Sequence, residues 1–367
     1  MAVKFLIVLF FSGYSTIGIS ERVSSYDGIK YYGKEVYLIE GNTIPESLKE
    51  SPFDRLPFSY KEKVRPAVWD LSKASAGLSV RFFSNTSTIY LKWELLNNKS
   101  MNHMAETGIK GLDLYCKIGK DWQYINTARP ESKINEALLV TNMTKEMREY
   151  KIFLPLYDGL QKLEIGIDSL SVINKPDRRV QKPIVFYGTS ITQGGCASRP
   201  GMAYSNIISR KLNIECVNYG FSGNGRMEKP IAELISGIDA LFYVIDCTPN
   251  MSIDEVKNNT IPLVDILRRK RPNIPVIFIE NLMYEKSFFD TVLRNELINK
   301  NAALKQEYKT LLRKGVTNIF YIESGEAIGN DHEATVDGIH FTDLGFMRFA
   351  DFLISKFEQL KLTKAKS

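Results

Sequence analysis

The stretch Val185-Phe-Tyr-Gly-Thr-Ser-Ile-Thr-Gln-Gly-Gly195 decides the fold of the C-terminal half. Its apolar beginning, residues 184–187, predicts a buried strand. The strand ends in Gly188-Thr-Ser190, and a helical pattern follows from about Ala203. Open α/β sheets bind ligands at the carboxyl ends of their strands. We therefore interpret Ser190 as a candidate nucleophile.

The rest of the C-terminal half alternates strand and helix patterns. Candidate strands lie at 184–187, 214–218, 240–245, 276–279 and 318–322, and candidate helices at 203–212, 230–236, 253–269, 287–314 and 343–360. Apolar runs without alternation indicate strands covered on both faces, hence a parallel sheet. The alternation predicts an α/β doubly wound domain.

Residues 28–170 read differently, as many short strands separated by turn signals, which predicts an all-β sandwich of the jelly-roll kind. Residues 171–183 are mostly polar and contain two prolines, a composition typical of a linker. We expect an N-terminal β-sandwich domain at 21–175 and a catalytic domain at 183–362.

The first 20 residues have the layout of a cleavable signal peptide. Lys4 is followed by an apolar run at 5–11 and by small residues up to Ser20. The run is too short to span a bilayer, so no stable membrane insertion is expected. We predict a periplasmic or secreted protein; the alternative is a buried first strand.

The amino-acid composition excludes few classes of partner or cofactor. The net charge of +6 is scattered over the chain, so no nucleic-acid partner is expected. The four cysteines show neither C-x-x-C nor zinc spacing, and free thiols are expected rather than disulfides. We expect no cofactor and no metal.

The candidate base is His340 within Asp337-Gly-Ile-His340. This loop follows the last predicted strand and opens at the same sheet edge as Ser190. Asp337 can orient the imidazole, which then takes a proton from the serine hydroxyl. The alternative is a surface turn with a helix cap, but Thr342 and Asp343 can supply that cap.

Two further loops reach this edge. Gly220-Phe-Ser-Gly-Asn-Gly225 lets backbone amides approach a ligand closely. Asn250 follows the third strand and offers an amide donor. Donors of this kind stabilise the oxyanion of a tetrahedral intermediate. The phosphate-binding alternative lacks both glycine signatures that define such loops.

In residues 184–360 these four blocks, in this order, resemble the SGNH (GDSL-type) hydrolase superfamily. The resemblance implies a flavodoxin-like three-layer αβα domain. It also implies that the amides of Ser190 and Gly223 and the side chain of Asn250 form the oxyanion hole. Gly220 remains an alternative donor to Gly223.

Two blocks depart from the family pattern. The first reads Gly188-Thr-Ser190 instead of G-D-S, and the third lacks the glycine and the aspartate that flank Asn250. The first departure leaves the proton relay intact. The second leaves Asn250 as the one residue of this block that matches.

Gly111-Leu-Asp-Leu-Tyr115 resembles the G-x-D-L-Y signature of a β-sandwich domain that precedes such hydrolases in secreted bacterial proteins. The strand's Asp and Tyr either hydrogen-bond locally or, with His103, wall the active site. Arg199 meets either a polar substrate or a surface carboxylate. Glu280 binds a sugar hydroxyl or caps the next loop, and His332 is expected to be structural or exposed.

Together these patterns predict an exported serine esterase that removes acyl groups, most of all acetyl, from a carbohydrate. One rival is a lipase or lysophospholipase, although the sequence shows no long apolar lid. The other is a non-catalytic glycan-binding protein that stacks sugars on Trp69, Trp93 and Trp122, residues that are more often buried.

Overall fold

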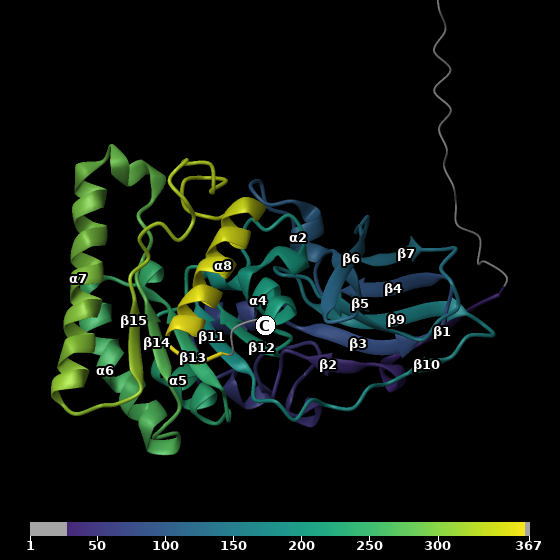
Figure 1. Cartoon of the computed structure of the whole chain (residues 1–367), viewed down its shortest axis with the longest axis horizontal. Helices are drawn as coiled ribbons and strands as arrows, with labels where there is room; N and C mark the ends of the chain where they lie inside the picture. The colour runs from purple at the N-terminus through teal and green to yellow at the C-terminus, as the bar shows by residue number, and fades with distance from the viewer. Residues whose placement is uncertain (1–27, 364–367) are drawn as a thin grey trace, which may run out of the picture.

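The computed structural model describes residues 28–363, so the predicted signal peptide at 1–20 lies outside the described residues. Figure 1 shows a β-sandwich at one end of the long axis and a parallel sheet with its helices at the other. Within the described residues, no helix is both long enough and apolar enough to cross a bilayer.

The N-terminal half forms two antiparallel sheets with strand orders β1-β9-β4-β7 and β10-β3-β8-β5-β6, and β2 pairs with β3. The strands are β1 Ile29–Tyr32, β2 Leu38–Glu40, β3 Ser79–Ser84, β4 Ile89–Leu95, β5 Leu112–Ile118, β6 Asp121–Ala128, β7 Ile134–Val140, β8 Arg148–Phe153, β9 Leu160–Asp168 and β10 Ile173–Asn174. Their inner faces share one apolar core that includes Phe82, Leu91 and Leu114. The predicted sandwich is confirmed.

The C-terminal half is a parallel five-stranded sheet of order β12-β11-β13-β14-β15, the flavodoxin order. Its strands are β11 Ile184–Gly188, β12 Cys216–Gly220, β13 Phe242–Asp246, β14 Val276–Ile279 and β15 Ile319–Ile322. Its helices are α3 Ser190–Gln193, α4 Tyr204–Leu212, α5 Lys229–Ser236, α6 Ile253–Lys270, α7 Thr291–Arg313 and α8 Asp343–Gln359. Short 3-10 helices lie at Lys34–Val36, Glu46–Leu48, Phe58–Tyr60, Pro200–Met202, Thr248–Asn250 and Glu285–Phe288.

Neighbouring residues of each parallel strand enter different cores. Phe186 packs in the cluster shared with α4 and α8, whereas Val185 and Tyr187 pack in the cluster shared with α5, α6 and α7. The sheet is therefore the middle of three layers, as predicted. The helix predicted at 287–314 begins late, because the Asp290 side chain caps α7 at the Leu293 amide, 3.0 Å away.

The N-terminal half also contributes to the α/β core. The helices α1 Pro66–Ser72 and α2 Glu106–Lys110 interrupt the sandwich. Val68 and Trp69 of α1 pack in the same apolar cluster as Val217 and Tyr219 of β12. The segment that contains α1 thus covers the β12 edge of the parallel sheet. All three tryptophans are under a tenth exposed, which favours core packing over sugar stacking.

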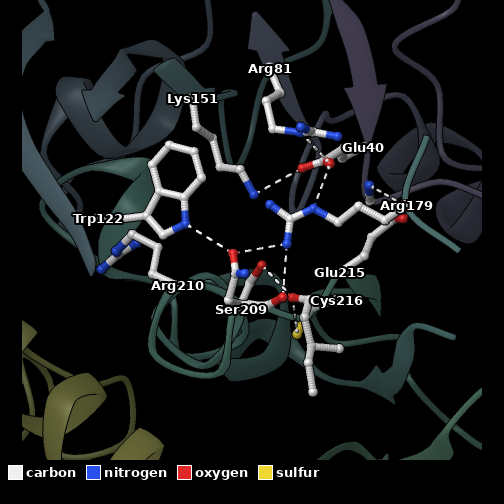
Figure 2. Close-up of polar contacts among 12 residues, drawn as sticks. Glu40, Arg81, Trp122, Lys151, Arg179, Ser209, Arg210, Glu215 and Cys216 are labelled. Atoms are coloured by element: carbon white, nitrogen blue, oxygen red, sulfur yellow. Dashed lines mark hydrogen bonds and ion pairs between the residues drawn. The ribbon is translucent and has the colours of Figure 1, made fainter. Parts of the chain in front are cut away.

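Buried ion pairs hold the linker against the sandwich (Figure 2). Glu40 of β2 lies 2.7 Å from Arg81 of β3 and 2.9 Å from Lys151 of β8. Arg179 reaches the same carboxylate at 3.3 Å and donates to the Asn213 carbonyl at 2.8 Å. Burial alone would raise the pKa of Glu40, but the surrounding cations lower it to about 2. We keep the domain boundary at 175–183 as a proposal.

Candidate active site

Ser190 lies where the chain turns sharply from β11 into α3. A Cβ at Gly188 would sit 2.0 Å from the Thr192 hydroxyl oxygen and 2.8 Å from the Asp246 carbonyl, so only glycine fits there. Ser190 is the first residue of α3 and is 7% exposed. Its carbonyl accepts a hydrogen bond from the Tyr157 hydroxyl at 3.4 Å. The sandwich half therefore supports the backbone of the serine.

His340 and Asp337 meet Ser190 in a continuous chain of contacts. The serine Oγ lies 2.8 Å from His340 Nε2, and His340 Nδ1 lies 2.7 Å from Asp337 Oδ2. The other oxygen, Asp337 Oδ1, accepts the backbone amides of Ile339 at 3.1 Å and His340 at 2.8 Å. The carboxylate thus fixes both its own loop and the imidazole.

The charge state of Asp337 follows from these bonds. Partial burial on its own would raise the pKa of the Asp337 carboxyl, but hydrogen bonds from the ring and the amide of His340 outweigh it and lower the pKa. An ionised carboxylate at Nδ1 favours the tautomer whose Nε2 lone pair faces the serine hydroxyl.

The glycine-rich loop has one amide free to serve as an oxyanion donor. Gly223 has a φ of +68°, and a Cβ there would meet no atom within 4 Å. In the described part of the chain, no hydrogen-bond acceptor lies on its amide. The amide of Gly220, by contrast, donates to Asn218 Oδ1 at 2.8 Å. This contrast favours Gly223 over Gly220 as the candidate oxyanion donor.

Asn250 lies in the 3-10 turn after β13. Its Oδ1 accepts the Gly225 amide at 3.3 Å, which ties it to the glycine-rich loop. The loop is in turn held to β11, since the Phe221 amide donates to the Gly188 carbonyl at 3.0 Å. With Oδ1 engaged, the Nδ2 group of Asn250 is the end available to donate.

Arg199 and Glu280 are occupied by protein partners. Arg199 donates to Asp113 Oδ2 at 2.8 Å and to the Tyr115 hydroxyl at 2.6 Å. Glu280 accepts the Tyr321 hydroxyl at 2.6 Å. For Arg199 the contacts favour a carboxylate partner over a polar substrate, although Asp113 is buried and not at the surface. For Glu280 they favour a structural role over a sugar contact. Asp113 also accepts the Thr127 hydroxyl of the neighbouring strand at 2.7 Å, the local hydrogen bond that one alternative predicted. The contacts of Asp113 and Tyr115 with Arg199 join the two halves in addition.

The other two histidines differ in their surroundings. The ring centroid of His103 lies 5.7 Å from that of His340, so a residue of the N-terminal half lines the site. His332 is half exposed and bonds Glu285 Oε2 at 2.8 Å, away from the serine.

Cys196, which sequence reasoning did not connect with the site, has its thiol beside Asp337 and His340. Its only sequence signal is its position six residues after Ser190.

Comparison with known proteins shows which family the chain resembles. The GDSL-like lipase/acylhydrolase family matches residues 181–358, and the N-terminal domain of SGNH-hydrolase-type esterases, called GxDLY, matches residues 29–173. A Bacteroides ovatus protein described as a GDSL-like lipase is 36% identical, with 92% of this chain and 100% of that chain covered and a TM-score of 0.88. The chain belongs to the GDSL-like lipase/acylhydrolase family. It is a hydrolase that acts on ester bonds.

Two more distant structures share the fold of this GDSL hydrolase. A salicylyl-acyltransferase from a tetracycline biosynthetic pathway has a TM-score of 0.75 at 14% identity, with 92% and 98% of the two chains covered. A family two carbohydrate esterase from Clostridium thermocellum, in complex with cellohexaose, has a TM-score of 0.57 at 13% identity, with 78% and 94% covered. No curated protein matches the sequence.

Proposed function

We propose that the protein is an exported serine esterase that deacetylates carbohydrate esters. The observation that carries the proposal is the contact chain from Ser190 Oγ through His340 to Asp337, with 2.8 and 2.7 Å between the heavy atoms. A serine hydroxyl needs such a base because it is a weak nucleophile near neutral pH.

The reaction would proceed in two halves. His340 Nε2 takes the proton of Ser190 as Oγ attacks the ester carbonyl, and the amides of Ser190 and Gly223 with the Asn250 side chain hold the oxyanion. The imidazolium then gives its proton to the leaving alcohol. Water, deprotonated by the same imidazole, hydrolyses the acyl-enzyme and releases the acid. No step requires a metal or a cofactor.

Two observations support a small acyl group on a sugar. Ser190 is only 7% exposed, and the His103 ring lies 5.7 Å from that of His340 beside it, which favours acetyl over a long chain. A structural relative carries the name of a carbohydrate esterase and was solved with cellohexaose. The proposed periplasmic or secreted location rests on the signal-peptide pattern of residues 1–20.

The test is the turnover of p-nitrophenyl acetate by Ser190→Ala. We expect a loss of about 10³-fold or more in kcat, because the nucleophile is gone. Ser355→Ala, on the exposed face of α8, is the matched control and should keep the wild-type rate. Wild-type turnover by Ser190→Ala would refute the triad.

Substrate class is decided by separate assays. Acetate release from a panel of acetylated polysaccharides is the expected result, with rates on p-nitrophenyl esters falling as the acyl chain lengthens. A preference for long acyl chains would instead favour the lipase or lysophospholipase alternative. Binding of glycans without release of any acid would favour the non-catalytic one.

A further inference from the structure

Four side chains with metal-binding atoms converge beside the serine: His103, Cys196, Asp337 and His340. One ligand atom from each lies within 4.8 Å of those of all the others. Two imidazoles, a thiol and a carboxylate form the mixed nitrogen, sulfur and oxygen set that Zn²⁺ takes in proteins. In sequence the four are spread over more than 200 residues, so no spacing motif marks them.

The backbone holds the cluster together from three directions. His103 lies in a turn closed by a bridge between Met101 and Met104, and Met104 is buried in the α/β core. Cys196 follows α3, which carries the serine at its start. The Asp337–His340 loop is held by its own hydrogen bonds. The ligands therefore come from segments that are already docked.

The cluster has a closed side and an open side. The Cys196 side chain is buried, His103 and His340 are partly exposed, and Asp337 is exposed. A hydrated ion can thus approach past the carboxylate and reach the thiol. Tetrahedral zinc bonds of about 2.0–2.3 Å place ligand atoms roughly 3.3–3.8 Å apart. The ligand atoms lie within 4.8 Å of one another, so binding requires them to move closer by roughly 1 Å.

We propose that these four residues form a Zn²⁺ site whose occupation reversibly arrests the hydrolase. Forming the sulfur–metal bond releases the Cys196 thiol proton to solvent. A metal on Nδ1 of His340 takes the place of the ring proton there. That proton moves to Nε2, so the neutral ring presents an N–H to Ser190. A metal on Nε2 displaces the serine hydroxyl instead. In both cases the lone pair that accepts the serine proton is lost.

The experiment measures metal binding itself, because ion binding does not depend on the proposed reaction. Only the arrest of hydrolysis by the bound ion rests on the proposed function. The reduced, metal-free protein is titrated with Co²⁺ under absorption spectroscopy and with Zn²⁺ in a calorimeter. We expect one ion per chain, tetrahedral d–d bands and a thiolate-to-cobalt charge-transfer band. Ser190→Ala should bind equally well, which separates this test from that of the triad.

Cys196→Ser should abolish the charge-transfer band. It should also weaken Zn²⁺ binding by about tenfold or more, since even the outer partners of metal ligands are worth 10–100-fold. The matched control is Cys116→Ser in β5, which should change neither. Hydrolysis by the wild type should stop with Zn²⁺ and return with EDTA. Cobalt binding to the wild type without a thiolate band, or equal Zn²⁺ affinity in Cys196→Ser, would overturn the site.

Discussion

The Asp337 carboxylate has two separable tasks, since Oδ1 holds the loop amides and Oδ2 holds the His340 ring. Asp337→Asn keeps the size of the side chain and the acceptor for the loop. It can, however, present an N–H to Nδ1, which favours the tautomer that protonates Nε2. We expect kcat for p-nitrophenyl acetate to fall by about 10²–10⁴-fold with little change in KM.

The control for this substitution is Asp331→Asn, which removes an exposed ion pair with Arg348 and should leave kcat within about twofold. Melting curves of both variants check that the fold survives. If Asp337→Asn retained the wild-type kcat, the carboxylate would not act on the imidazole.

At this scale the sequence predicts what is local and misses what is tertiary. Asp337 and His340 are three residues apart, so their pairing follows from the motif. The surroundings of Arg199 do not, because Asp113 and Tyr115 come from another half of the chain. The sequence did not connect Cys196 with the site either, because Asp337 and His340 follow it some 140 residues later.

At the scale of elements, the end of β13 carries a buried acid that the proposed reaction does not use. Asp246 is 4% exposed, and its Oδ2 accepts the Thr192 hydroxyl at 3.0 Å and the Tyr204 hydroxyl at 3.1 Å. Desolvation raises the pKa of Asp246 to about 7, against which these two hydrogen bonds act. The acid joins β13 to α3 and α4.

This shift makes stability depend on pH. An unfolded aspartate ionises near about pH 4, whereas Asp246 keeps its proton in the fold up to about pH 7. Folding therefore takes up a proton between these values, and the free energy of unfolding falls as the pH rises through the window. Asp246→Asn removes the titration and should gain about 2–4 kcal/mol relative to wild type between pH 4 and pH 8.

Urea unfolding of wild type and Asp246→Asn at both pH values measures this difference. The exposed Asp70→Asn substitution in α1 serves as the control and should show no such change. An equal stability difference between Asp246→Asn and wild type at the two pH values would contradict the prediction.

Element type could be predicted from the sequence where burial is uniform, as in the parallel strands. The observed strand ends differ from the predicted ones by about two residues. The strand β12, for example, is predicted at 214–218 and spans Cys216–Gly220. The helices α1 and α2 were missed for a physical reason. Their apolar residues, such as Val68 and Ile109, pack in the α/β core rather than in the sandwich.

At the scale of the whole molecule, the sandwich half acts as part of the hydrolase scaffold. Arg55 is 1% exposed and inserts between the two halves. It donates to the carbonyls of Asn218 at 3.2 Å and Gly220 at 2.7 Å at the end of β12, and to that of Leu71 at 2.6 Å. Its charge thus fixes the strand that leads into the Gly223 loop.

Removing this guanidinium should harm both stability and catalysis. Arg55→Met leaves several buried carbonyls without a donor, and we expect the free energy of unfolding to fall by about 2–4 kcal/mol. Because the Gly220 carbonyl is released next to the loop that carries Gly223, the proposed oxyanion donor, kcat per folded molecule should also fall, with KM little changed. Arg55→Lys should recover part of both, since one ammonium can reach fewer carbonyls.

Urea unfolding and steady-state hydrolysis of p-nitrophenyl acetate are measured on the same preparations. Lys34→Met is the control, because it removes only an exposed ion pair with Glu46. A loss of stability with unchanged kcat per folded molecule would mean that the sandwich merely anchors the sheet. A joint loss, relieved in part by lysine, means that the loop with the proposed oxyanion donor Gly223 depends on a residue of the other half.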